Sequence, residues 1–353
     1  MDRSLYETII YNIRNGELPG DFSLPDEESG DGPRFADGAM DGITVYHMGP
    51  DSLDEAGARQ MIKALKYAAA GNTREADEAF AELGRTHRAI SIIDELQKYI
   101  YTHTDKLDGN NVFGSVMYMI LHSRSRESVK FGLSILEMFT AADEQTKEIV
   151  RRIGLSDEFT VFSVWNMLKW DNANEEIFRL IQKVHGWGRI HALERLEADT
   201  PEIRRWMIME GIQNDVMPAY SALTVWDKAD PGSLLAGSMT KEEFAAVGNI
   251  IYALLDEGPV TGISELENAQ DILMSYLARS EEFDLDIEDY ETVFEIWGWA
   301  SGKEMTFSAV VDRCMEILSS VSCEECIRSA VMTGKGYRIA DMLGIDHPEE
   351  NEE

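Results

Sequence analysis

The most distinctive local feature of this 353-residue chain is the heptapeptide HGWGRIH at positions 185–191. Around it, residues 179–206 carry six Lys and Arg against four acidic residues, whereas the whole chain has 32 against 65. Arg and Trp dominate binding hot spots because each offers a large contact area with a polar group. We predict that this basic island binds an acidic peptide or a phosphate group through His185, Trp187, Arg189, His191, Arg205 and Trp206. The alternative is that Trp187 fills the core and the arginines pair with local acids.

The two histidines of the heptapeptide are a candidate metal pair. Their H-x5-H spacing does not place both rings on one face of a helix, unlike the i, i+4 spacing of metallohydrolase helices. No Asp or Glu lies at a sequence spacing from either histidine that is typical of a metal site. We therefore predict no metal site at His185 and His191.

A CxxC motif at residues 323–326 and a third cysteine, Cys314, raise the question of zinc or redox chemistry. A structural zinc site needs four ligands, and the second CxxC is missing. His347 could serve as a fourth ligand. The acidic residues inside the motif raise the pKa of its thiols, which does not suit a redox pair. We interpret the three cysteines as small buried residues on helices.

The acidic hexapeptide at residues 284–289 resembles the start of a calcium-binding loop, with Glu295 at the twelfth position. The sixth position of such a loop is Gly, which permits a sharp turn, and here it is Asp289. We therefore interpret this segment as an acidic cap before a helix.

The chain shows no recognisable catalytic motif. No glycine-rich phosphate loop follows a strand, and no GxSxG motif is present. We predict no catalytic residues and no cofactor, and we lean toward a protein that is not an enzyme.

The composition excludes several classes of protein. The formal net charge of −33 repels phosphate backbones and anionic lipid, so we do not expect binding to nucleic acid. No apolar run approaches the roughly 20 residues of a membrane span, so we expect no membrane association. The first residues lack the basic and apolar regions of a signal peptide, and three cysteines cannot all pair, so we expect a cytoplasmic protein. The acid keeps such a protein soluble or attracts a basic partner.

The acid is concentrated near the start of the chain. Residues 17–55 contain 11 acidic residues and one basic residue, Arg34. Prolines and glycines recur through residues 16–51, which we predict to be an acidic extended segment. Residues 43–48 are its only convincing strand. We also hypothesise that this acidic segment covers the basic island, because opposite charges attract.

After residue 52 the apolar residues recur at helical spacing in units of 10–18 residues. The dipeptide Glu-Ile recurs at positions 148, 176 and 202, which are 28 and 26 residues apart. A pair of short helices cannot bury its apolar face alone and must stack on its neighbours. Residues 125–228 resemble HEAT or armadillo-like repeats in this pattern. The resemblance implies an all-α fold, an α-solenoid with a concave binding surface.

Residues 184–197 are also similar to bacterial proteins of unknown function that are sometimes labelled limonene hydroxylase. A hydroxylase requires haem, flavin or a His–His–carboxylate iron site to activate oxygen. None of these is recognisable in the sequence, so we discount the label.

These observations predict four regions: residues 1–51 with a first helix and the acidic segment, a helical-repeat region at 52–228, a helical region at 229–346 and a frayed tail at 347–353. We expect a non-catalytic helical scaffold that binds a protein or peptide partner through the basic island. The alternatives are an enzyme and a helical-repeat protein that handles nucleic acid.

Overall fold

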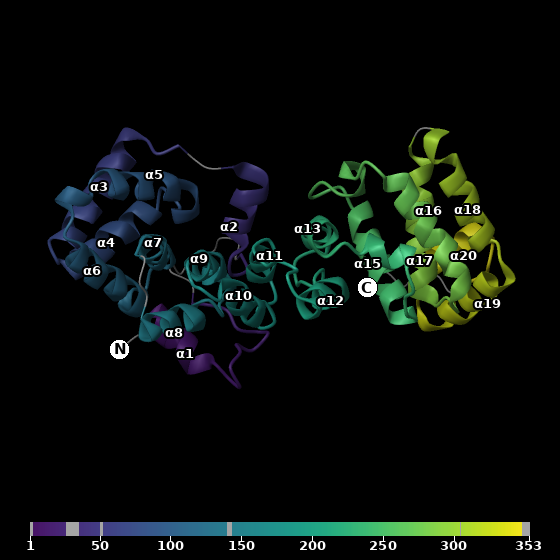
Figure 1. Ribbon diagram of the computed structural model, residues 1–353, viewed down its shortest axis with the longest axis horizontal. Helices are drawn as coiled ribbons and strands as arrows, with labels where there is room; N and C mark the ends of the chain where they lie inside the picture. Colours follow the sequence, from purple (N-terminus) through teal and green to yellow (C-terminus); the bar gives the residue numbers. More distant parts are fainter. Residues whose placement is uncertain (1–2, 26–34, 50–51, 140–142, 304, 348–353) are drawn as a thin grey trace. The chain divides into compact units, whose positions relative to one another are not determined.

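The computed structural model describes residues 3–25, 35–49, 52–139, 143–303 and 305–347. Within these ranges every regular element is a helix and no strand forms, so the predicted all-α class is confirmed. The chain divides into two compact units (Figure 1). Unit 1 comprises residues 1–196 and 214–216, and unit 2 comprises residues 197–213 and 217–353. The solenoid arrangement stays a prediction, and most of the predicted frayed tail, residues 348–353, lies outside the described ranges.

Unit 1 is built around one helix that is buried on all sides. Its helices are α1 (Leu5–Asn12), α2 (Ala39–Ile43), the π-helix η1 (Thr44–Met48), α3 (Glu55–Ala69), α4 (Thr73–Gly84), α5 (Ala89–Thr102), the 3-10 helix η2 (Thr104–Lys106), α6 (Gly109–His122), α7 (Arg126–Leu136), α8 (Glu144–Ile153), α9 (Asp157–Met167), α10 (Ala173–Ile181) and α11 (Trp187–Leu193). α7 packs against α4, α5, α6 and α9 (Figure 1). Every residue from 127 to 136 is buried. A polar side chain on α7 therefore needs a partner inside the protein.

Several helices of unit 1 begin where a side-chain oxygen accepts a free backbone N–H. Asp54, Asp108, Ser125 and Asp143 cap α3, α6, α7 and α8 in this way. Such caps satisfy the backbone groups that a first helical turn leaves unpaired.

The predicted strand at residues 43–48 is wrong, because this part of the chain is helical. α2 covers residues 39–43 and η1 continues it to residue 48. A strand needs a neighbouring strand for its backbone hydrogen bonds, and the described part of the chain offers none. Gly38 and Gly49 bracket the two helices with φ angles of 76° and 72°, which favour glycine.

Unit 2 is a second helical assembly with its own core. Its helices are α12 (Pro201–Glu210), α13 (Ala219–Ala229), α14 (Gly232–Ala236), α15 (Lys241–Leu255), η3 (Ile263–Glu265), α16 (Ala269–Arg279), η4 (Ser280–Glu282), α17 (Ile287–Ser301), η5 (Met305–Phe307), α18 (Ser308–Leu318), α19 (Val321–Ala330), η6 (Val331–Thr333) and α20 (Tyr337–Leu343), with every η here a 3-10 helix. α15 packs against α12, α13 and α17, and α17 packs against α18. The rings of Phe244 and Tyr276 stack in this core, with centroids 4.6 Å apart. The predicted boundary at residues 228 and 229 falls inside this unit, at the end of α13.

The acidic hexapeptide at residues 284–289 starts α17, which confirms its interpretation as a helix cap. The Asp286 carboxylate accepts the backbone N–H of Asp289, and the Asp289 carboxylate accepts that of Asp286. Lys241 forms an ion pair with Asp289. The acidic side chains thus accept hydrogen bonds from the free N–H groups at the start of the helix and pair with a neighbouring lysine.

Candidate functional site

The six residues predicted to form a binding patch belong to both units. His185, Trp187, Arg189 and His191 lie in unit 1, at and within α11, whereas Arg205 and Trp206 lie on α12 of unit 2. His185 and Arg205 are exposed, and Trp187, Arg189, His191 and Trp206 are buried. Their role in binding stays a prediction, and the buried members act as core residues in the described structure.

Trp187 packs against the acidic segment. A Cβ atom built on Gly42 would lie 2.1 Å from Cε3 of Trp187, so only glycine permits this approach. The ring of Tyr46 lies 5.9 Å from the ring of Trp187, between centroids, and the Tyr46 hydroxyl donates a hydrogen bond to Glu194. The acidic segment therefore covers α11 through apolar and aromatic contacts.

The glycines that flank Trp187 belong to a turn held by Asp157. One Asp157 oxygen accepts the N–H of Gly188 at 2.9 Å, and the other accepts that of Gly186 at 3.2 Å. A Cβ atom on Gly188 would lie 2.3 Å from Asp157 Oδ1. Burial raises the pKa of Asp157 to about 6, although the two N–H groups act in the opposite direction. The two glycines therefore have a structural role, since they allow the backbone of this turn to approach the Asp157 carboxylate.

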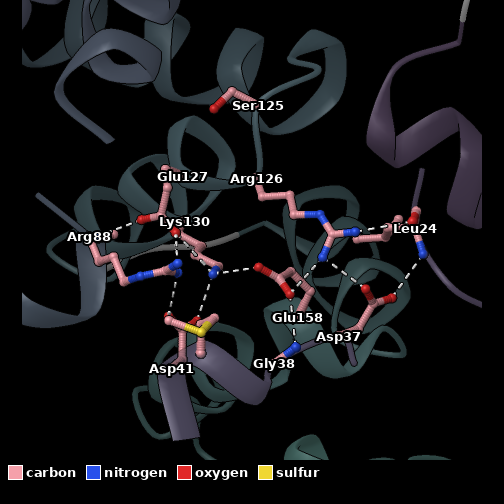
Figure 2. Close-up of polar contacts among 12 residues, drawn as sticks. Leu24, Asp37, Gly38, Asp41, Arg88, Ser125, Arg126, Glu127, Lys130 and Glu158 are labelled. Atoms are coloured by element: carbon pink, nitrogen blue, oxygen red, sulfur yellow. Dashed lines mark hydrogen bonds and ion pairs between the residues drawn. The ribbon is translucent and has the colours of Figure 1, made fainter. Parts of the chain in front are cut away.

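The charged centre of unit 1 is Lys130, a residue that the sequence analysis did not select (Figure 2). Its Nζ atom lies 2.6 Å from Glu158 Oε1, 2.7 Å from Asp41 Oδ2 and 3.2 Å from Glu127 Oε1. The Lys130 side chain is 1% exposed, so these carboxylates replace water as its partners. Three elements meet here, because Asp41 comes from α2, Glu127 from α7 and Glu158 from α9.

Arg126 extends this charge cluster toward the start of the acidic segment (Figure 2). Its guanidinium donates to Asp37 at 2.9 Å, to Glu158 at 3.1 Å and to the Leu24 carbonyl at 3.0 Å. Asp37 in turn accepts the Leu24 N–H at 2.9 Å. Among the described residues, the cations that pair with acids of the segment are Arg88, Arg126 and Lys130, and none of them belongs to the basic island.

The charges in this cluster set the pKa values of one another. Burial alone lowers the pKa of Lys130, but the carboxylates outweigh it and raise that pKa well above its ordinary value. Burial raises the pKa of Asp41 to about 6 against the effect of Lys130. Burial raises the pKa of Glu158, but the positive charges of Lys130 and Arg126 outweigh this effect and lower that pKa to about 2. Ionised Glu158 therefore stabilises the fold, and this contribution is lost as the pH falls from about 4.5 toward 2.

An open cavity lies elsewhere in unit 1, and we call it the amino-terminal pocket. Its volume is about 500 Å³, and α1, α8, α9 and α10 contribute to its walls. It is lined by Ile10, Ile13, Gly16, Glu148, Arg151, Arg152, Leu155, Met167, Glu176, Arg179, Leu180 and Lys183. Two of the six basic residues of the predicted island, Arg179 and Lys183, face this cavity.

A second cavity, of about 250 Å³, lies along the acidic segment. Phe22 and Asp37 line it from the segment, and Asp157, His185 and Trp187 line it from the body of unit 1. His185, the exposed member of the predicted patch in this unit, therefore borders a cavity.

The cysteines lie on the last helices of unit 2. Cys314 is buried on α18 and Cys323 on α19, whereas Cys326 is partly exposed. Burial raises the pKa of both Cys314 and Cys323 to about 12. Burial also raises the pKa of Cys326, and nearby acids add to this effect. Thiols in such surroundings are poor nucleophiles.

Comparisons with protein-family models, curated proteins and solved structures found no match. Within the described ranges, no group of three or more His, Cys, Asp and Glu side chains is placed to hold a metal ion. In the same ranges, none of the helices combines the length and the apolar character needed to cross a bilayer.

Proposed function

We propose that this protein is a non-catalytic helical binding protein and that unit 2 binds a basic segment of a partner protein. The observation that carries this proposal is the uneven charge of the chain. Unit 2 has 32 acidic residues against 10 Lys and Arg, a net charge of −22. Unit 1 has 33 against 22, a net charge of −11, although it is the longer unit. A field of this strength attracts cationic partners and repels nucleic acid.

Exposed apolar side chains accompany the acid at the end of unit 2. Met305 is 90% exposed, Met332 78% and Val321 71%. Met305 lies in η5, Val321 in α19 and Met332 in η6. These elements follow one another along the chain in the order η5, α18, α19 and η6, and α18 contacts both η5 and α19. Methionine side chains adapt to partners of different shape. Exposed apolar side chains supply the contact area that charge alone does not.

Exposed acids lie on α18 and α19. Asp312 and Glu316 are exposed on α18, and Glu324 and Glu325 are exposed on α19. We call these four acids and the three apolar residues above the α18–α19 surface. Glu316 pairs with Arg313 and Glu324 with Arg328, whereas Asp312 and Glu325 form no ion pair with a described residue. The chemistry fits an amphipathic basic helix, whose apolar face would contact the methionines while its Lys and Arg side chains meet Asp312 and Glu325.

The test uses a fluorescent amphipathic peptide of Lys and Leu, roughly 20 residues long. We expect the full-length protein to bind this peptide, as measured by fluorescence anisotropy, and the affinity to fall as the salt concentration rises from about 50 to 300 mM. The double variant Asp312→Lys/Glu325→Lys should weaken binding by about tenfold or more.

The matched control is Glu267→Lys/Asp271→Lys, which reverses two exposed acids at and before α16 in the same unit. It changes the net charge by the same amount and should alter the affinity less than about twofold. Equal losses in the two variants would show that the peptide responds only to net charge, and the proposal would then fail. Absence of peptide binding at low salt would also overturn it.

A further inference from the structure

The amino-terminal pocket of unit 1 has the size of a small-molecule site. Its volume of about 500 Å³ lies within the range of about 300–1,000 Å³ typical of ligand pockets. It is lined by side chains from four helices and by Gly16, in the turn after α1. Helices that pack on one another hold such a cavity open more firmly than a loop does.

The apolar part of the pocket consists of Ile10, Ile13, Leu155, Met167 and Leu180. Ile10, Ile13 and Leu155 are only half-buried, so they present apolar surface to the cavity. Met167 and Leu180 are buried beneath it. An aliphatic group that entered the pocket would remove this surface from water, at about 25 cal/mol for each Å² buried.

The charged part of the pocket is predominantly cationic, with Arg151, Arg152, Arg179 and Lys183 against Glu148 and Glu176. This excess of positive charge stands out in a chain whose net charge is −33.

Both acids of the pocket are already bound by arginines. Arg151 donates to the two oxygens of Glu176 at 2.9 and 3.0 Å, a bidentate pair. Arg152 donates to Glu148 at 2.6 Å. The two carboxylates therefore hold Arg151 and Arg152 in place, and their charge is matched by these two guanidinium groups.

Lys183 is a cation of the pocket that takes no part in these two ion pairs. It forms no ion pair with any residue in the described ranges. A Cβ atom built on Gly16 would lie 3.6 Å from Lys183 Nζ, which places the ammonium group beside the turn after α1 at the pocket. Arg179 on α10 pairs with Glu175 at 3.3 Å and with Glu176 at 3.5 Å. Its side chain is still 62% exposed, so it adds a second positive charge that a ligand can reach.

We propose that the amino-terminal pocket binds a small amphipathic anion, a single carboxylate or phosphate group on an aliphatic chain. The anionic group pairs with Lys183 and Arg179, and the aliphatic chain covers Ile10, Ile13 and Leu155. A cationic ligand is repelled by the four basic side chains, and a neutral one leaves Lys183 without an anion. This site is independent of the basic-peptide surface proposed for unit 2.

The test titrates the full-length protein with decanoate, below its micelle concentration, in a calorimeter. Decanol and decylamine provide neutral and cationic ligands with the same chain, and decyl phosphate distinguishes a phosphate from a carboxylate group. We expect decanoate or decyl phosphate to bind, and decanol and decylamine to bind at least about tenfold more weakly, which corresponds to one ion pair of about 1.4 kcal/mol.

Three variants locate the ligand. Lys183→Met and, as a second variant, Arg179→Met should each weaken anion binding by about tenfold, and Ile13→Trp should block the cavity. Lys66→Met removes an exposed lysine from α3 of the same unit and should leave the affinity unchanged. Equal binding of decanoate and decanol, or decanoate binding that survives both charge variants, would overturn the proposal. Failure of both anions to bind would do the same.

Discussion

The Nζ atom of Lys130 lies 2.7 Å from the Oδ2 atom of Asp41, and both side chains are almost completely buried (Figure 2). This pair joins the acidic segment to α7, the central helix of unit 1. The part of the acidic segment that forms α2 therefore contributes to the unit 1 core. Its removal would leave Lys130 with fewer anionic partners in a place that water does not reach.

Replacing Lys130 by methionine tests the contribution of this cluster. The variant keeps the aliphatic stem but leaves Asp41, Glu127 and Glu158 without their shared cation. Loss of one partner of a buried ion pair costs roughly 3–5 kcal/mol, and we expect a decrease of that size in the free energy of unfolding in urea. Lys66→Met is the control, and a loss below about 1 kcal/mol for Lys130→Met would contradict this account.

The pH dependence of stability tests the environment of Asp157. Burial raises the pKa of Asp157 to about 6 in the folded protein, from an ordinary value of 3.8. The folded chain therefore binds a proton that the unfolded chain releases between pH 6 and 4, so a falling pH favours the folded state in this window. The stability of the wild type relative to Asp157→Asn should rise by roughly 2 kcal/mol between pH 7 and pH 4.

The comparison between the two proteins cancels the general effect of net charge, which both share. A difference between wild type and Asp157→Asn that stays constant with pH would show that Asp157 titrates near its ordinary value.

Two glycine-to-alanine variants distinguish the effect of close packing on stability from the effect of helix propensity. A Cβ atom at Gly188 would meet Asp157 Oδ1 at 2.3 Å and Thr160 Oγ1 at 2.4 Å, whereas one at Gly114 meets nothing within 4 Å. Gly188→Ala should destabilise the protein by roughly 1–3 kcal/mol. Gly114→Ala, inside α6, should stabilise it by roughly 0.5–1 kcal/mol. Thermal and urea unfolding measure both, and equal effects would mean that the turn at Gly188 is not tightly packed.

The cysteines should differ in reactivity toward an aromatic disulfide reagent. Burial raises the pKa of Cys314 and Cys323 to about 12, and both are inaccessible. In the folded protein near pH 8, Cys326 should react first, and the other two at least about 100-fold more slowly. Rapid reaction of Cys323 together with Cys326 would instead indicate an accessible CxxC pair.

Much of the helical content could be predicted from periodicity and local caps. The helical region predicted at residues 229–346 contains α17, which spans residues 287–301 with Asp286 as its cap. It also contains α15, which begins after its cap residue Thr240. Both signals are local, since a cap and an apolar stripe involve residues within a few turns.

The charge cluster could not be predicted because it joins residues far apart in the chain. Asp41 and Lys130 are 89 positions apart, and no local pattern links them. One signal was available, a single lysine within the otherwise uncharged run SVKFGLSIL of α7. A lysine in such a run needs a buried anion, but nothing in the sequence says which one.

For the predicted patch, the sequence suggested a binding site, but its tryptophan Trp187 is buried in the structure. Residue types typical of binding sites stand close together at positions 185–191, yet Trp187 is packed against Gly42, whose place beside it depends on the fold of unit 1. The alternative interpretation, that Trp187 fills the core, agrees with its burial.

Hydrogen–deuterium exchange on the full-length protein, with and without the Lys/Leu peptide, tests the proposed function most directly. The account predicts slower exchange at residues 305–333, which span η5, α18, α19 and η6, and unchanged exchange in α16. Protection confined to other helices, or spread evenly over the acidic surface of both units, would contradict it.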